Sequence, residues 1–155
     1  MLFRSTSIGI NDRDLTEGII SNAYKSPSSG VTYIYLQQSF KTLPVYNQLV
    51  TLAFSNGQLV SKTGSIIEEI DQKVNSASIF ASITPEKAVL SAIRYKKITF
   101  GAPLVPFALV PGKKYDYGKA GIANENITAE LLWVPDEIKG AVKLAWQVRS
   151  EEHTS

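Results

Sequence analysis

The sequence has no cysteine and a single histidine. Without cysteine the chain can form no disulfide, no thiolate metal site and no cysteine nucleophile. The one histidine, His153, lies in the polar tail 151–155, has no second histidine with which to build a zinc site, and is poorly placed for a Ser-His-Asp triad. We therefore expect neither catalytic nor metal-binding residues here, and a chain that is not itself an enzyme.

The chain also has little net charge. Its 16 Lys and Arg are nearly balanced by 14 Asp and Glu, which leaves a net charge of +2. The longest basic runs are Lys96-Lys97 and Lys113-Lys114, whereas nucleic-acid-binding domains cluster their cations. No run approaches the ~20 apolar residues of a membrane span. The N-terminus also lacks the ~7–15 apolar residues of a signal peptide. Nucleic-acid binding and a membrane span are thus excluded, and either a cytoplasmic protein or a piece of a longer chain remains.

Two pairs of acids, Asp12 with Asp14 and Glu68 with Glu69, are the nearest approach to an acid–base couple. Neither pair has the placement that such chemistry needs, and solvated surface residues are the simpler interpretation. Asn126-Ile127-Thr128 matches a glycosylation acceptor, but a three-residue pattern is weak evidence.

Sheet-forming patterns dominate the first half of the chain. Residues 31–40, 45–54 and 58–67 are rich in β-branched and aromatic residues, and Asn56-Gly57 is a strong hairpin signal. Residues 31–67 are therefore predicted to form a three-stranded antiparallel meander. Residues 15–24 favour a further strand over a helix, because Gly18 has a low helix propensity.

The second half is predicted to contain a helix and a hairpin. A polar connector, 68–78, leads to a helix with Thr84 as its N-cap and Pro85 at its first position. A loop with short extended pieces, 99–126, precedes two strands near 127–136 and 141–150. Trp133 and Trp146 are expected to be cross-strand partners in one core. The expected fold class is α+β, with antiparallel sheets and one or two packed helices.

Polar and aromatic side chains gather where the first two meander strands turn. An amide at a strand end can pair with the backbone of a partner, and a proline turn presents a surface of low entropy. Sheet scaffolding is the favoured role for each of these side chains, and contact with a protein partner is the hypothesis that we carry forward for Gln37, Gln38, Thr42, Pro44, Tyr46 and Asn47.

Two blocks of the chain resemble known propeptide sequences. Residues 30–64 resemble the fungalysin/thermolysin propeptide motif, through Gly30, Val31, Tyr33, Tyr35, Gln38, Pro44, Val45, Asn47, Asn56 and Gly57. Residues 83–93 and 129–149, with Trp133 and Trp146, resemble a PepSY-type domain. Thr42-Leu43 stands where the motif often has glycine, and the final strand of the PepSY pattern is missing.

The resemblance implies the propeptide region of a secreted M36 fungalysin-type zinc metallopeptidase. It implies cystatin-like halves, a motif domain at 1–75 and a PepSY-like domain at 76–155 that lacks its last strand. Such a region would act in cis as chaperone and inhibitor of the catalytic domain and then be removed. Zinc would belong to that downstream domain, and no cofactor or small-molecule ligand is expected in this chain.

Other functions remain open. A free-standing extracellular or periplasmic protease inhibitor would have the same composition. An independent enzyme is disfavoured by the single histidine and the absence of cysteine. Under the propeptide hypothesis, an extended segment would lie along the active-site cleft as a strand, and the segment 99–126 is the best candidate.

Overall fold

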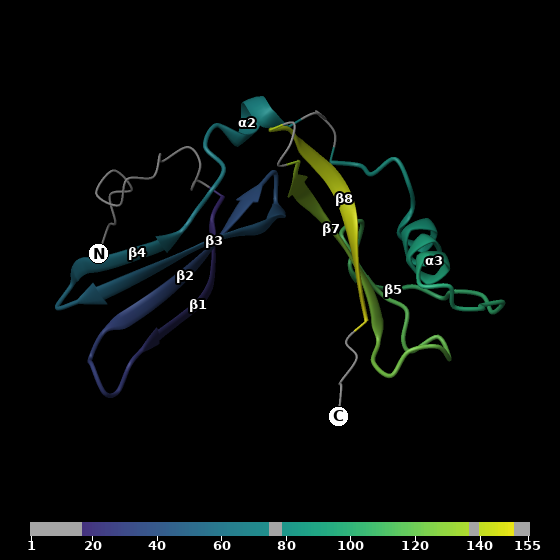
Figure 1. Cartoon of the computed structure of the whole chain (residues 1–155), viewed down its shortest axis with the longest axis horizontal. Coiled ribbons are helices and arrows are strands. Elements are labelled where there is room, and N and C mark those ends of the chain that lie inside the picture. The colour runs from purple at the N-terminus through teal and green to yellow at the C-terminus, as the bar shows by residue number, and fades with distance from the viewer. Residues whose placement is uncertain (1–16, 75–78, 137–139, 151–155) are drawn as a thin grey trace. The chain divides into compact units, whose positions relative to one another are not determined.

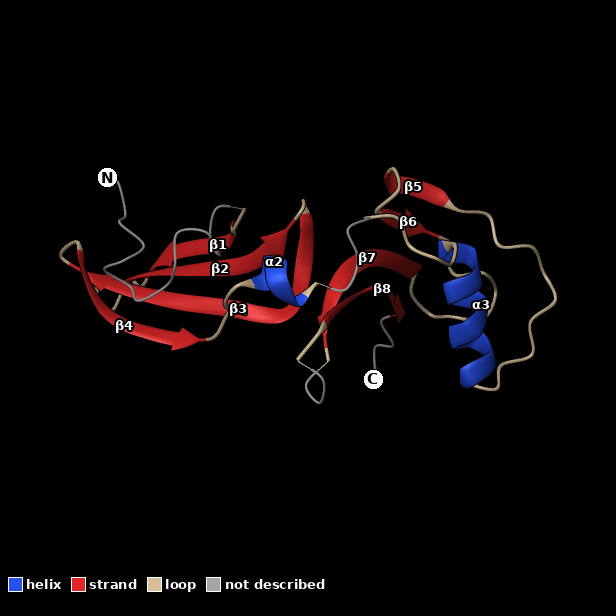
Figure 2. Cartoon of the chain, turned by 90° about the horizontal axis from the view of Figure 1, so that it is seen from above, coloured by secondary structure: helices blue, strands red, loops and turns tan. Residues whose placement is uncertain are grey.

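The computed structural model describes residues 17–74, 79–136 and 140–150, and this part of the chain contains eight strands and two helices (Figures 1 and 2). It divides into two compact units. Unit 1 combines Met1–Asn75 with Trp133–Lys143, and unit 2 combines Ser76–Leu132 with Leu144–Ser155. A single cut at residue 75 therefore does not separate them, because 133–143 belongs with the first unit.

Unit 1 is built on an antiparallel sheet in which each strand pairs with its neighbours in sequence (Figure 1). Its strands are β1 (Ile19–Lys25), β2 (Thr32–Phe40), β3 (Leu43–Ser55) and β4 (Gln58–Gly64). The predicted meander is confirmed, and the strand predicted before it is confirmed as β1.

Both hairpins of the meander turn through left-handed backbone. Asn56 and Gly57 have φ of 50° and 78°, as a two-residue turn between twisted strands requires. Lys41 and Thr42 have φ of 49° and 65°, a conformation that is rare for a β-branched residue. Pro44 is the second residue of β3 and lies opposite Ser39.

One face of this sheet carries the core of unit 1. Val50, Leu52 and Phe54 alternate along β3 and are buried. The partly buried side chains that pack on them come from β2, β4 and the segment after β4, and they are Ile34, Leu36, Leu59 and Ile66. Hydrophobic burial on this face accounts for the period-2 pattern of the sequence.

The start of β3 belongs to a second cluster, centred on Trp133. Val45 pairs in parallel with Trp133, which lies in β7 (Ile127–Pro135). The Trp133 indole is fully buried, donates from Nε1 to Phe40 O at 2.8 Å, and packs on the Phe40 ring. A short helix, α2 (Ile70–Lys73), ends at Val74, which bridges to Val142.

Unit 2 consists of one helix on a second sheet. The helix α3 (Pro85–Tyr95) starts as predicted, since Thr84 Oγ1 accepts from Lys87 N. Its sheet contains β5 (Phe107–Val110), β6 (Lys114–Asp116), the first part of β7 and most of β8 (Val142–Ser150). Side chains from both layers form the core, and they are Val89, Ile93, Tyr117, Ile127 and Ala129.

Two expectations are wrong. The fold is mainly β rather than α+β, because the predicted loop 99–126 forms β5 and β6 and because α2 is only four residues long. The two tryptophans are not partners in one core. Trp133 packs on Phe40 within unit 1, whereas Trp146 packs on Tyr115 within unit 2.

Candidate functional site

The two adjacent glutamines of β2 lie at a bulge. The pairing of β2 with β3 shifts between Gln37, which faces Leu49, and Ser39, which faces Pro44. A bulge frees backbone groups from the ladder, and buried carbonyls need other donors. Gln37 Nε2 supplies one, donating to Val45 O at 2.7 Å and to Gln48 O at 3.0 Å.

Gln38 is completely buried, with 0% of its surface exposed. Its Nε2 donates to Ile67 O at 2.8 Å, and its Oε1 accepts from Ile67 N at 2.9 Å. The side-chain amide thus pairs with the Ile67 backbone as a neighbouring strand would. Because the amides of Gln37 and Gln38 are bound within the chain, the scaffolding alternative describes both residues in this structure.

The four other predicted contact residues lie on the turn and at the start of β3. Thr42 and Asn47 are exposed, Tyr46 is 39% exposed and Pro44 is half-buried. Thr42 N donates to Glu17 Oε2 at 2.7 Å, which helps to hold the left-handed turn. Asn47 also has a positive φ, of 56°. Thr42, Pro44, Tyr46 and Asn47 therefore remain a candidate contact surface.

The residues that carry the sequence resemblance mostly build unit 1. Gly30 turns the chain with φ of 69°, and its N–H donates to Ser26 O at 2.9 Å. Val31 is half-buried beside it. Val45 and Trp133 are fully buried together, and Gly57 completes the second hairpin. Trp146 is the exception, because it belongs to unit 2.

Three tyrosines stack on the sheet of unit 1. Tyr24 lies opposite Tyr33, with ring centroids 5.3 Å apart, and 6.2 Å from Tyr35. A hydrogen bond with the Tyr35 side chain raises the pKa of Tyr24 above its ordinary value of 10.0. Tyr33 and Tyr35 therefore contribute aromatic pairing across β1 and β2.

The sequence did not reveal how exposed β5 is. Every residue from Val105 to Val110 is exposed and none is charged, and Phe107 is 70% exposed. β5 pairs with β6 through Phe107, Ala108 and Val110, and no strand pairs with its other edge within the described part of the chain. Prolines flank β5 at Pro106 and Pro111, but the strand itself carries no charge, and an exposed apolar strand edge is typical of an interaction site.

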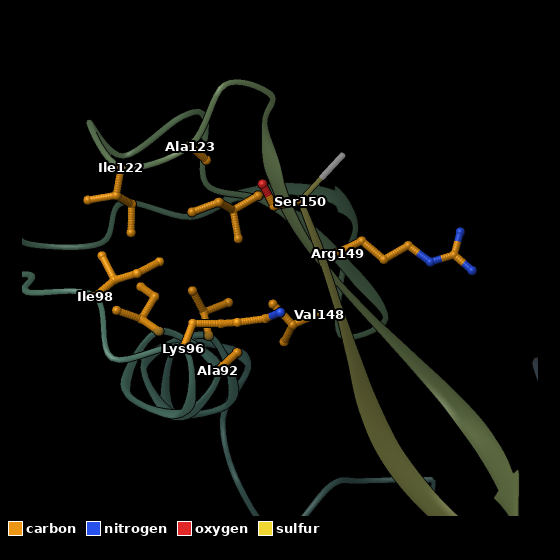
Figure 3. A pocket seen from close by; sticks show the side chains of 11 residues that line it. Ala92, Lys96, Ile98, Ile122, Ala123, Val148, Arg149 and Ser150 are labelled. Carbon is orange, nitrogen blue, oxygen red and sulfur yellow. The ribbon is translucent and has the colours of Figure 1, made fainter. Parts of the chain in front are cut away.

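A cavity of about 600 Å³ opens in unit 2 between α3, the end of β8 and two loops (Figure 3). Its lining is aliphatic on three sides, with Ile93 from α3, Ile98 and Ile122 from the loops, and Val148 from β8. Its polar residues within the described part of the chain are Lys96, Arg149 and Ser150, and no described acid lines it. The volume lies within the ~300–1,000 Å³ usual for ligand sites.

No described residues form a group of His, Cys, Asp or Glu that could hold a metal ion. Of the acid pairs considered above, Glu69 directly precedes α2 and has a φ of 52°. In the sequence that matches a glycosylation acceptor, Asn126 Nδ2 donates to Asp116 Oδ2 at 2.9 Å. Asp12, Asp14 and His153, which were considered above as candidate catalytic residues, lie outside the described residues. No helix among the described residues is long and apolar enough to span a membrane.

Comparison with known proteins supports the resemblance in its first block. Residues 19–66 match the Fungalysin/Thermolysin Propeptide Motif. They cover β1 to β4, both glutamines and the contact surface at the turn. The match does not reach the residues on which the PepSY resemblance rests. No curated protein matches the chain. The motif indicates a non-catalytic propeptide region of a fungalysin/thermolysin-type peptidase.

Proposed function

We propose that this chain is the propeptide region of a secreted M36 fungalysin-type zinc metalloendopeptidase, and that it assists folding of the catalytic domain and holds it inactive until removal. The observation that carries the proposal is the propeptide motif at 19–66. The zinc of such an enzyme belongs to the catalytic domain. The second part of the chain would then be the PepSY-like domain, with an approximate division at 75–76.

The exposed strand β5 is the element best suited to restrain a peptidase. Peptidases bind substrates in extended form, and an apolar edge with free backbone groups can add to a cleft as a strand. Phe107 and Leu109 are 70% and 46% exposed, and aromatic side chains often dominate binding energy. This narrows the contact segment expected at 99–126 to Val105–Val110, with Thr42, Pro44, Tyr46 and Asn47 as a second contact surface.

Inhibition of the catalytic domain from the same reading frame tests this function. The purified chain is titrated into that domain while peptide hydrolysis is followed, and saturable inhibition is expected. Phe107→Lys should raise the inhibition constant at least about tenfold. The matched control is Ile20→Lys on β1, another exposed edge strand, where Ile20 is 62% exposed; it should change inhibition less than about twofold.

The outcomes separate the two roles. Equal inhibition by the Phe107 and Ile20 variants would show that β5 does not contact the catalytic domain. No inhibition by the folded chain would exclude the inhibitory role, and refolding of the denatured catalytic domain with and without the chain would then test the chaperone role alone. A reading frame that encodes no His-Glu-x-x-His helix would favour the alternative, a free-standing extracellular or periplasmic inhibitor module.

A further inference from the structure

We infer that the cavity of unit 2 is the specificity pocket of a peptide-binding groove between α3 and β8. The occupant is an extended peptide whose last residue is a branched aliphatic one with a free C-terminal carboxylate. This site goes beyond the proposed function, since it shares no residue with β5 or with the turn surface of unit 1. Three independent observations on unit 2 support it.

The first observation is a strand edge that borders the cavity. Three successive residues of β8, Val148, Arg149 and Ser150, line it. Figure 3 shows the Arg149 side chain pointing away from the cavity, so Arg149 borders it through its backbone. Within the described residues β8 pairs with β7, and its one further bridge is at Val142. The backbone from Leu144 to Ser150 can therefore pair with an added strand.

The second observation is the chemistry of the walls. The aliphatic surface comes from Val89, Ala92, Ile93, Ile127 and Val148, and no aromatic side chain of the described residues lines the cavity. Branched aliphatic walls favour a side chain such as that of Val, Ile or Leu over a planar ring, because packing rewards complementary shape. In a strand, alternate side chains point to one face, so a peptide on β8 would direct one side chain into the pocket.

The third observation is charge. Lys96 follows the last turn of α3, is exposed and lines the cavity, so its ammonium lies where the cavity meets solvent. In the view of Figure 3 its side chain extends from α3 toward β8. Among the described residues, which end at Ser150, no acid lines the cavity. A carboxylate next to the buried side chain would meet this ammonium, and a C-terminal residue carries both groups at the required short separation.

Two peptides that differ only at the C-terminus test the inference. N-acetyl-Ser-Thr-Val-Thr-Ile with a free carboxylate and the same peptide as the C-terminal amide are titrated into the full chain, and binding is followed by NMR. The acid should shift the methyl signals of Ile98 and Ile122 and the amide signal of Arg149. It should bind about tenfold more tightly than the amide.

Variants of the chain check each part of the groove. Lys96→Gln should remove the preference for the acid, whereas Lys97→Gln, an equal loss of charge at an exposed neighbour outside the cavity, should retain it. Ala92→Leu should fill the pocket and weaken binding of the acid at least about tenfold. If Ala92→Leu does not fold, the inference is still tested by the comparison of the acid with the amide and by Lys96→Gln.

Three results would overturn the inference. Equal affinity for the acid and the amide would show that the site does not recognise the C-terminal carboxylate. Sodium octanoate binding as tightly as the peptide would indicate a site for alkyl carboxylates that does not use the β8 edge. No binding of the acid in the millimolar range would show that the cavity is not a peptide site.

Discussion

The two units bury polar side chains in opposite ways. In unit 1, Gln38 is fully buried and both ends of its amide bond the Ile67 backbone, while Ser39 Oγ donates to Glu17 O. In unit 2, the Tyr117 hydroxyl is buried and makes no hydrogen bond of normal geometry among the described residues, although the Glu86 side chain is near enough to affect its pKa. A satisfied buried amide fixes strand register, whereas an unsatisfied hydroxyl reduces stability. Unit 1 is thus specified partly by polar groups and unit 2 mainly by packing.

The strongest test of this difference is Gln38→Ala. It leaves the Ile67 N–H and C=O without their partner and leaves a cavity, so the free energy of unfolding should fall by about 3–4 kcal/mol. Urea denaturation followed by tryptophan fluorescence measures it. Gln58→Ala, at an exposed residue of the second hairpin, is the control and should stay within about 0.5 kcal/mol of the native chain. Similar losses in both variants would refute the role assigned to Gln38.

Each unit contains one tryptophan, so the two residues allow the units to be compared. Each indole Nε1 donates to a distant carbonyl, Trp133 to Phe40 O and Trp146 to Ile83 O. Trp133 is fully buried, whereas Trp146 is half-buried, and water can replace part of what Trp146 loses. Trp133→Phe should therefore destabilise by about 2 kcal/mol and Trp146→Phe by about 1 kcal/mol. The reverse order in denaturation experiments would contradict the burial argument.

The smallest expected effect has the opposite sign. Tyr117→Phe removes a buried hydroxyl that makes no hydrogen bond of normal geometry within the described part of the chain, so stability should rise by up to about 1 kcal/mol at neutral pH. Burial, and next the charge of Glu86, raise the pKa of Tyr117 above its ordinary value of 10.0. A raised pKa favours the neutral phenol in the folded state. Its contribution is therefore complete below pH 10.0 and lost as the pH rises beyond it.

Unfolding at about pH 8 and about pH 11 checks the pH dependence. The native chain should lose more stability between the two values than Tyr117→Phe does. Tyr95→Phe is the matched control, because it removes the hydroxyl of a tyrosine that is 85% exposed. Equal pH dependence in the native chain and the Tyr117 variant would show that this phenol does not couple titration to folding.

Local chemistry decided which parts of the fold could be predicted. The hairpin at Asn56-Gly57 and the start of α3 at Thr84 depend on adjacent residues, and both predictions are confirmed. The short helix α2 was missed, because Glu69 precedes it in a left-handed conformation and gives no side-chain cap. β5 and β6 were predicted only as extended pieces, since the prolines and glycines around them indicate turns.

The candidate site was less predictable, because its contacts join residues far apart in sequence. Gln37 and Gln38 were predicted to face a partner, as an amide at a strand end can do. The partner of Gln38 is Ile67, 29 residues away, and nothing local identifies it. The cavity likewise forms where α3 and β8 lie side by side, and no short sequence pattern predicts that they do.

The membership of residues 133–143 in unit 1 has a consequence for the order in which the chain is made. A ribosome releases residues 17–74 well before Trp133, whose indole completes the cluster around Phe40 and Val45. The first part of β7, which belongs to unit 2, is synthesised in between. Unit 1 therefore cannot be completed until the larger segment of unit 2, Ser76–Leu132, has been synthesised, and the segment of unit 2 that starts at Leu144 follows last.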